Sequence, residues 1–193
     1  MVKNVDGAIV ECGIGRGRSL VVLSALNTLL GDGHGGGREI FGFDSFQGFP
    51  EPRPEDASYR EPKKGEWSSS PSGMYEYSPD FILEVLACAN LEGKVKRDAL
   101  HKGFFCETLP TFDCGTIAIL HLDGDLYDSY RDPLLNLYDR VAVGGVIVFD
   151  DFATVPDGPD RFPGGRQATI EFFADKPEDL RNTNRGTPYV IKE

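Results

Sequence analysis

The fold is decided by Ile117-Ala-Ile-Leu-His-Leu-Asp-Gly-Asp-Leu-Tyr-Asp-Ser-Tyr130, taken together with Gly144-Gly-Val-Ile-Val-Phe-Asp-Asp151. Each stretch is an apolar run of strand length that ends in carboxylates. A continuous apolar run is typical of a parallel strand whose two faces are both covered by helices. In open α/β sheets the ligand binds beyond the carboxyl ends of the strands. If the two runs are neighbouring parallel strands, four carboxylates meet at that edge: Asp123, Asp125, Asp150 and Asp151.

Such a group of carboxylates indicates a site for a divalent cation. Four of them in one place repel one another unless a cation lies among them or some are protonated. Carboxylate oxygens are hard ligands of the kind that Mg²⁺ prefers. The alternative is that each Asp caps the helix that follows, because Asp is favoured at helix N-termini. Two pairs, each at the end of a buried-type strand, favour the metal site over the caps.

Length and charge limit the remaining possibilities. The chain has 193 residues, of which 40% are hydrophobic, and this predicts one domain with its own core. The formal net charge is −11, so nucleic acid and an anionic membrane surface are both disfavoured as partners.

The sequence also predicts a cytosolic protein. We see neither an apolar run of the roughly 20 residues that a membrane span needs nor a signal peptide. The four cysteines follow no metal-ligand spacing, so we expect free thiols.

Strand and helix patterns alternate along the chain, which predicts a doubly wound sheet. The expected strands are Gly7–Cys12, Glu39–Asp44, Val95–Leu100, Ile117–Asp123 and Val143–Asp151, with a closing hairpin of Asp179–Asn184 and Pro188–Lys192. The expected helices are Leu20–Leu30, one that starts at Ser78-Pro-Asp80, Asp128–Arg140 and Arg166–Ala174. Residues 45–77 are rich in Pro, Ser and charge without a clear period, and such long irregular segments are often functional.

A glycine-rich turn follows the first expected strand and indicates a nucleotide-type cofactor. Strand, glycine turn and helix together bring backbone N–H groups to a ligand. The nicotinamide fingerprint requires Gly-x-Gly-x-x-Gly, but here Gly13, Gly15 and Gly17 alternate and Arg18 stands at the third fingerprint position. With Glu11 at the strand end, the pattern looks like motif I of S-adenosylmethionine (SAM) methyltransferases. A plain structural turn is the alternative.

Asp44 ends the second expected strand and is the candidate ribose ligand. An acid at this distance from a glycine turn can accept both ribose hydroxyls of an adenosine, in NAD as well as in SAM. The alternative is that Asp44 only forms the turn before Ser45.

Six strings resemble the macrocin O-methyltransferase (TylF/MycF) family, in order from about residue 7 to residue 173. Two of them, Asp-Ser-Phe-x-Gly-Phe-Pro and Asp-Gly-Asp-x-Tyr-x-Ser, are specific to that family. The strings are Val10-Glu-Cys-Gly13, Phe43-Asp-Ser-Phe-Gln-Gly-Phe-Pro50, Lys102-Gly-Phe-Phe-Cys-Glu-Thr-Leu-Pro110, Leu122-Asp-Gly-Asp-Leu-Tyr-Asp-Ser129, Val148-Phe-Asp-Asp-Phe152 and Gly165-Arg-Gln-Ala168.

The resemblance implies a fold, an activity and a set of site residues. Members of the family depend on SAM and Mg²⁺ and methylate sugar hydroxyls on antibiotics. Their class I methyltransferase (Rossmann-like) fold is a doubly wound, mostly parallel seven-stranded sheet whose last antiparallel pair is supplied by the tail. The implied metal ligands are Asp123, Asp150 and Asp151, and the implied general base is Asp125. The implied cofactor-binding residues are Glu11, Gly13, Gly15, Ser19, Asp44, Ser45, Gly103, Phe104 and Asp123.

The chemistry of the residues agrees with that assignment. A sugar hydroxyl has a pKa near that of water, too high for an unaided carboxylate, whereas a divalent cation lowers the pKa of a coordinated oxygen by many units. For several other polar and aromatic residues we expect no part in the chemistry. These are His121 as a packed, hydrogen-bonded residue, Tyr130 as pocket wall or core, Trp67 as an anchor of its own loop, and Arg16 and Arg18 as solvated or paired side chains.

We therefore expect metal-dependent methyl transfer from SAM to a hydroxyl of a vicinal diol, a sugar of a natural product. The alternatives are an NAD-linked oxidoreductase and a non-catalytic SAM-binding scaffold; homo-oligomerisation stays open. Residues 1–193 are expected to form a single methyltransferase domain without the family's N-terminal extension, because only Met1–Asp6 precede the first strand. Three explanations for the missing extension stay open. The acceptor is smaller, or the lid over the site comes from residues 45–77 or from a partner chain, or the sequence is a fragment.

Overall fold

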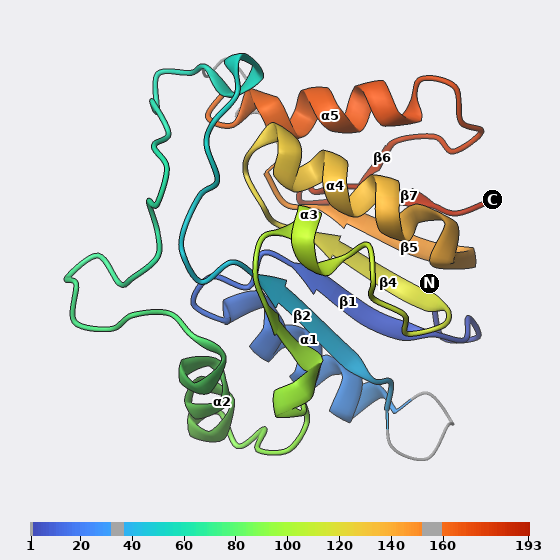
Figure 1. The fold of residues 1–193 in the computed structure, drawn as a ribbon. Coiled ribbons are helices and arrows are strands. Elements are labelled where there is room, and N and C mark those ends of the chain that lie inside the picture. The colour runs from blue at the N-terminus through green and yellow to red at the C-terminus, as the bar shows by residue number, and fades with distance from the viewer. Residues whose placement is uncertain (1, 32–36, 152–159) are drawn as a thin grey trace.

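The chain forms an open sheet with helices on both faces (Figure 1). A computed structural model describes residues 2–31, 37–151 and 160–193. Within these ranges seven strands lie in the order β3-β2-β1-β4-β5-β7-β6. Their bounds are Ala8–Cys12 (β1), Ile40–Asp44 (β2), Leu100–Lys102 (β3), Ile117–Leu122 (β4), Val141–Phe149 (β5), Arg181–Asn182 (β6) and Pro188–Ile191 (β7).

The first five strands are parallel, and the last two are antiparallel. β1 pairs with β2 and β4, β2 with β3, and β4 with β5, all in parallel. β7 runs antiparallel to β5 and to β6. The β6–β7 turn is closed by the Thr183 N–H, which donates to the Thr187 carbonyl at 2.9 Å. The predicted doubly wound, mostly parallel seven-stranded sheet with a C-terminal hairpin is confirmed.

Helices cover the two faces in separate layers (Figure 1). The α1 and α2 side chains form one buried cluster with one face of the sheet, and the α4 and α5 side chains form another with the opposite face. Both faces of β1 and β4 are therefore buried, which is why their sequences are apolar except for Glu11 and His121, which contact each other. The helices are α1 (Arg18–Leu30), α2 (Pro79–Cys88), α3 (Phe105–Thr108), α4 (Tyr127–Leu137) and α5 (Pro163–Phe173), with 3-10 turns η1 (Pro54–Asp56), η2 (Arg97–Ala99) and η3 (Tyr138–Arg140).

Among the predicted boundaries, those of the third strand and of the last helix were wrong. The third strand was expected over Val95–Leu100, but residues 97–99 form η2 and β3 begins only at Leu100, because the charged side chains before it stay near the surface while Leu100 is buried. α5 begins at Pro163, three residues before the expected Arg166. The early start has a packing reason: a Cβ on Gly165 would meet the Tyr130 ring at 2.8 Å, so the first turn of α5 lies directly against α4. Residues 152–159, between β5 and α5, lie outside the described residues.

Residues 45–77 connect β2 to α2 and run past the carboxyl ends of the strands (Figure 1). The buried Asp56 of η1 fixes this segment to the rest of the fold. Its Oδ1 accepts a hydrogen bond from the Tyr127 N–H at 2.7 Å, and its Oδ2 accepts one from the Arg53 N–H at 2.8 Å. Asp56 therefore satisfies the first free N–H of α4 and holds the irregular segment beside the edge of the sheet where the acidic residues emerge.

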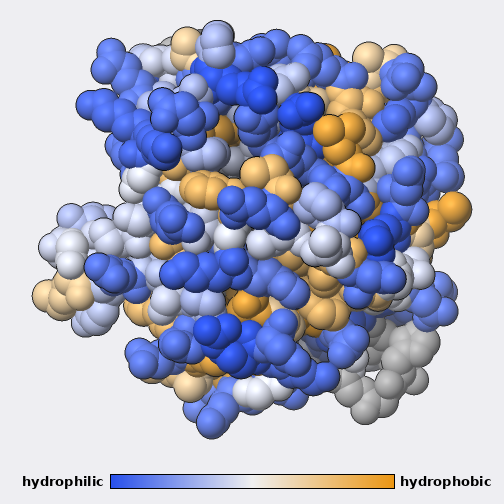
Figure 2. Space-filling view, in the orientation of Figure 1, coloured by the Kyte–Doolittle hydropathy of each residue, from blue (hydrophilic) through white to orange (hydrophobic). Residues whose placement is uncertain are grey.

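The surface in the same orientation is mostly hydrophilic, and its hydrophobic residues form separate small areas (Figure 2). In the part of the chain that the structure describes, none of the helices has the length and apolar character needed to cross a bilayer.

Candidate active site

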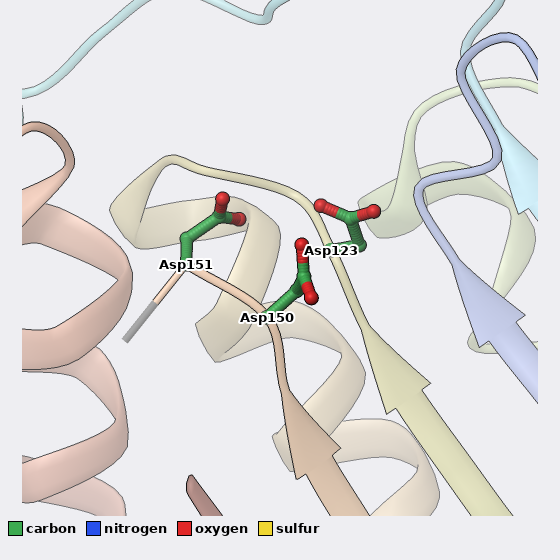
Figure 3. Close-up of side chains that lie close together, drawn as sticks. All are labelled: Asp123, Asp150 and Asp151. Carbon is green, nitrogen blue, oxygen red and sulfur yellow. The ribbon is translucent and has the colours of Figure 1, made fainter. Parts of the chain in front are cut away.

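The ends of β4 and β5 bring three carboxylates together. The two strands are parallel neighbours with Leu122 opposite Phe149, so the residues that follow them leave the sheet side by side. The Asp150 N–H donates to the Leu122 carbonyl at 2.9 Å and extends this pairing by one residue. Asp123, Asp150 and Asp151 each offer an oxygen within 4.8 Å of the others, around a common space (Figure 3). The predicted convergence of the two strand tips is confirmed.

This cluster is electrostatically unfavourable by itself. Burial raises the pKa of Asp123 to about 8; the carboxylates of Asp151 and Asp150 add to the rise, and His121 opposes it. Like charges held this close disfavour full ionisation, whereas a cation among them reverses the effect. Three carboxylate oxygens at this spacing are a suitable donor set for Mg²⁺ or another hard divalent ion. The residues therefore fit the metal that the sequence predicts.

The raised pKa of Asp123 predicts that the metal-free protein becomes less stable as the pH rises. Between the ordinary value of 3.8 and about 8, the folded state holds a proton that the unfolded state has lost. This contribution to the free energy of unfolding is present in full below about pH 4 and is lost as the pH passes about 8. Thermal unfolding in EDTA between pH 5 and 8.5 should show the decline.

Mg²⁺ should counteract that decline. At about 100 times its Kd, it should add about 2.7 kcal/mol to the free energy of unfolding, or roughly 5 to 10 °C in Tm for a chain of this size. The added stability should be largest at the alkaline end, because protons compete with the ion for the carboxylates. A Tm equal with and without Mg²⁺ at pH 8 would count against the metal site.

Asp125 is close to the cluster but has a different geometry. It adopts a left-handed backbone conformation (φ 61°), which is strained for a residue other than glycine, and its side chain is buried. Its N–H donates to Oδ2 of Asp151 at 2.9 Å. Burial, then the charges of Asp151 and Asp123, hold the pKa of Asp125 well above its usual range, and Arg161 opposes the rise. A carboxylate with a raised pKa is a stronger base than an ordinary one.

Tyr130 lies under the cluster and positions Asp151. It is fully buried in the core, as one of its two predicted interpretations required, and not on the pocket wall. Its hydroxyl oxygen accepts from the Asp151 N–H at 3.1 Å, and the same hydroxyl has two acceptors in reach, the Leu122 carbonyl at 3.1 Å and Oδ2 of Asp151 at 3.2 Å. A single hydroxyl thus connects the ends of β4 and β5.

Replacing Tyr130 by phenylalanine should weaken metal binding roughly 10- to 100-fold, the range seen when a hydrogen-bond partner of a metal ligand is removed. The buried Asp151 N–H also loses its acceptor, so the free energy of unfolding should fall by about 1–3 kcal/mol. Calorimetric Mg²⁺ titration and urea unfolding measure the two effects. Tyr127→Phe is the matched control, because its hydroxyl donates to the exposed Glu171 instead; equal Mg²⁺ affinities of the two variants would exclude this role.

The glycine turn is held against the metal cluster by backbone contacts and by Asp44. A Cβ on Gly13 (φ 96°) would overlap the Asp123 carbonyl, so only glycine allows β1 to turn this close to β4. Oδ2 of Asp44 accepts from the Ile14 and Gly15 N–H groups at 2.9 and 2.8 Å, and Oδ1 accepts from the Phe46 N–H at 2.7 Å. Burial raises the pKa of Asp44, against the effect of these three donors. Asp44 is therefore a turn-forming residue, as its alternative interpretation predicted; its contact with a ribose stays a prediction.

Glu11 lies behind His121. The two residues are opposite each other on β1 and β4, and Oε1 of the fully buried Glu11 lies 3.0 Å from Nδ1 of His121. Burial lowers the pKa of His121, but the hydrogen bond and charge of Glu11, with Asp123 and Asp150, raise it overall. The structure thus brings His121, and not the carboxylate of Glu11, to the surface of the cavity. His121 is thus the packed, hydrogen-bonded residue that the sequence predicts, and its even spacing from Asp123 on one strand accounts for its place on the same face.

The carboxylates, the glycine turn and His121 line one cavity of about 1290 Å³, which exceeds the roughly 300–1,000 Å³ of a typical small-molecule pocket. Most of the predicted site residues line it; Glu11 and Gly103 do not. Residues that the sequence analysis did not assign to the site complete the wall, from the 45–77 segment and from the start of α5. The predicted residues that line the cavity are Gly13, Gly15, Ser19, Asp44, Ser45, Phe104, Asp123, Asp125, Asp150 and Asp151.

Comparison with known proteins identifies the family. The profile of the Macrocin-O-methyltransferase (TylF) family matches residues 1–168. The chain is 32% identical to a demethyldecarbamoylnovobiocin O-methyltransferase of Streptomyces niveus, over 82% of this chain and 57% of the relative. It is also 32% identical to 8-demethyl-8-(2,3-dimethoxy-alpha-L-rhamnosyl)-tetracenomycin-C 4'-O-methyltransferase of Streptomyces olivaceus, over 79% and 56%.

A solved structure agrees with the sequence comparisons. The O-methyltransferase NovP is 29% identical, with a TM-score of 0.75 over 98% of this chain and 73% of that chain. The chain thus spans somewhat more than half the length of the curated relatives it matches. The family profile over residues 1–168 and the two relatives at 32% identity show that the chain belongs to the macrocin O-methyltransferase family.

Proposed function

We propose that the protein transfers a methyl group from SAM to a hydroxyl of a vicinal diol, with the help of a divalent cation. The observation that carries the proposal is the group of Asp123, Asp150 and Asp151 oxygens in the same cavity as the glycine turn. The relatives support it, since their names describe O-methyltransferases and one name includes a rhamnosyl group. We infer a sugar of a natural product as the acceptor.

The glycine turn and its neighbours bind the cofactor. SAM supplies a methyl group on a positively charged sulfonium sulfur. Gly13 and Gly15 leave their backbone open to the cavity, Ser19 follows at the start of α1, and Asp44 and Ser45 lie at the end of β2. Phe104 lines the same cavity, Gly103 sets the direction of the chain before it (φ 148°), and Glu11 acts by orienting His121. Asp123 borders both the turn and the acidic cluster.

The acidic residues activate the acceptor hydroxyl. Asp123, Asp150 and Asp151 would hold Mg²⁺ or a similar ion, which would supply a lowered pKa at the acceptor hydroxyl. Asp125 then accepts the hydroxyl proton, for which its raised pKa suits it. The hydroxyl oxygen gains the methyl group, and the sulfonium becomes a neutral sulfide. Residues 45–77, held beside the strand ends by Asp56, limit access of water to this step.

Isothermal calorimetry with SAM and with NAD, each with and without Mg²⁺, tests the cofactor. We expect SAM to bind and NAD not to bind. Methyl transfer to a panel of sugars with adjacent hydroxyls, in Mg²⁺ and in EDTA, then tests the reaction. Transfer that continues in EDTA would overturn the role of the metal, and SAM binding without transfer to any member of the panel would favour a non-catalytic scaffold.

A further inference from the structure

Three aromatic side chains form a distinct part of the cavity wall. The ring of Trp67 lies 4.9 Å from that of Phe49 and 5.8 Å from that of Phe162, measured between centroids. All three line the cavity, and they come from two separate parts of the chain: the 45–77 segment and the residue before α5. We call them the aromatic wall.

The backbone around the aromatic wall is tightly constrained. The Phe49 N–H donates to the Glu66 carbonyl and the Gly65 N–H donates to the Phe49 carbonyl, both at 3.0 Å, which ties the two ends of this loop together. Trp67 adopts a left-handed conformation (φ 65°), and its side chain is 43% exposed. A strained aromatic residue left half exposed in a cavity is typical of a residue held for contact with a ligand. Its expected role as an anchor of its own loop does not account for that exposure.

Arg161 lies over the aromatic wall. Its guanidinium carbon is 5.5 Å from the centroid of Trp67 and 5.0 Å from that of Phe162, and its side chain lines the cavity. Stacking on aromatic rings holds the flat guanidinium in place while its N–H edge stays available.

Within the described residues Arg161 has no carboxylate within ion-pair distance. Other cations of the cavity wall are paired: Arg53 with Asp128, Arg131 with Asp128 and Asp132, and Lys64 with Glu51. The neighbouring Asp160 is paired with Arg166 at 2.6 Å. Arg16 and Arg18 line the cavity, are exposed like Arg161 and also have no such partner among these residues, but no aromatic ring of the described residues lies under either guanidinium, whereas Trp67 and Phe162 lie under that of Arg161. In a chain with a net charge of −11, an unpaired and stacked guanidinium in the cavity indicates a bound anion.

We propose that Arg161, stacked on the aromatic wall, binds an oxyanion of the acceptor, so that the preferred acceptor is an acidic sugar bearing a carboxylate or a phosphate ester. The inference rests on the proposed function, since it concerns the acceptor of that reaction. A guanidinium matches both anions with two parallel hydrogen bonds, which a neutral sugar cannot offer. The sugar ring then lies against the aromatic wall, with its hydroxyls toward Asp125 and the metal ligands.

The single tryptophan of the sequence makes this proposal directly testable. Fluorescence excited at 295 nm reports only on Trp67 and therefore on occupancy of the aromatic wall. Methyl glucoside, methyl glucuronide and glucose 1-phosphate are titrated at constant Mg²⁺ and S-adenosylhomocysteine. We expect at least one acidic sugar to bind at least about tenfold more tightly than the neutral glucoside, the size of a charge-assisted hydrogen bond. The two acidic arms distinguish a carboxylate from a phosphate.

The variants Arg161→Met and Arg60→Met test which arginine is responsible for tighter binding of acidic sugars than of neutral sugars. Arg60 also lies over Trp67, at 5.0 Å, but it pairs with Glu66 and does not line the cavity. Arg161→Met should make the Kd values of acidic and neutral sugars equal, whereas Arg60→Met should keep the difference. Equal Kd values in the wild-type protein, or a preference that survives in Arg161→Met, would overturn the proposal.

This experiment does not depend on methyl transfer. If SAM binds and neutral sugars are methylated while no acidic sugar is preferred, the proposed function stands and the oxyanion site is wrong. If acidic sugars bind through Arg161 but SAM does not bind, the oxyanion site stands and the proposed reaction is wrong.

Discussion

Asp150→Ala is expected to reduce metal-dependent methyl transfer by roughly a thousandfold or more, the upper range for losing a group that stabilises charge in the transition state. The substitution removes one of three oxygens that lie within 4.8 Å of one another. Affinity for SAM should stay within a few-fold, because Asp150 follows β5 and is not part of the glycine turn. Transfer rates at saturating Mg²⁺ and calorimetric SAM titration measure the two quantities.

The matched control for this variant is Asp139→Ala. Asp139 is an exposed residue of η3 and does not line the cavity, so its loss should leave both quantities unchanged. Transfer by Asp150→Ala at more than a tenth of the wild-type rate would contradict the assignment of Asp150 as a ligand. A loss of SAM affinity as large as the loss of rate would place Asp150 in the cofactor site instead.

Asp125→Asn should lower kcat by about 10²–10⁴-fold, the usual contribution of a general base. Asparagine is the appropriate replacement because it tolerates the left-handed backbone of this position, and the N–H that donates to Asp151 is kept. We therefore expect affinities for Mg²⁺ and SAM within a few-fold of the wild type. Single-turnover rates with the two titrations separate the loss of the base from a loss of binding.

Asp175→Asn makes the same chemical change at an exposed position outside the cavity and should be neutral. If Asp125→Asn instead loses Mg²⁺ affinity in proportion to kcat, Asp125 acts as a fourth ligand and not as the base. If Asp125→Asn keeps the kcat of the wild type, Asp125 is not the general base that accepts the hydroxyl proton.

The parallel strands and the meeting of their carboxylates were predictable because that information is local. The run before Asp150 is apolar, and the run before Asp123 is apolar except for His121, which is typical of strands covered on both faces. Strands of that kind are parallel, so their acidic ends had to emerge on one edge of the sheet. The prediction for β3 was wrong for a related reason: a three-residue strand preceded by charged residues is too short to show a periodic pattern of apolar side chains.

The roles of individual side chains were less predictable because they depend on distant neighbours. Glu11 was expected beside the cofactor, but its contact with His121 becomes visible only when β1 and β4 are in register. Asp44 has the right position for a ribose ligand, yet its oxygens already hold the glycine turn. No local pattern distinguishes these arrangements.

The sequence by itself determined the order of strands and helices, the family strings and the edge at which the acidic residues gather, because periodicity and burial are encoded residue by residue. Only the tertiary structure decided three contacts: which carboxylates lie close enough together to bind one metal ion, that the Tyr130 hydroxyl accepts a hydrogen bond from the Asp151 N–H, and that Arg161 lies over Trp67. Those contacts join segments far apart in the chain. Their distances are set by how helices and loops pack on the sheet, and packing is a property of the whole fold.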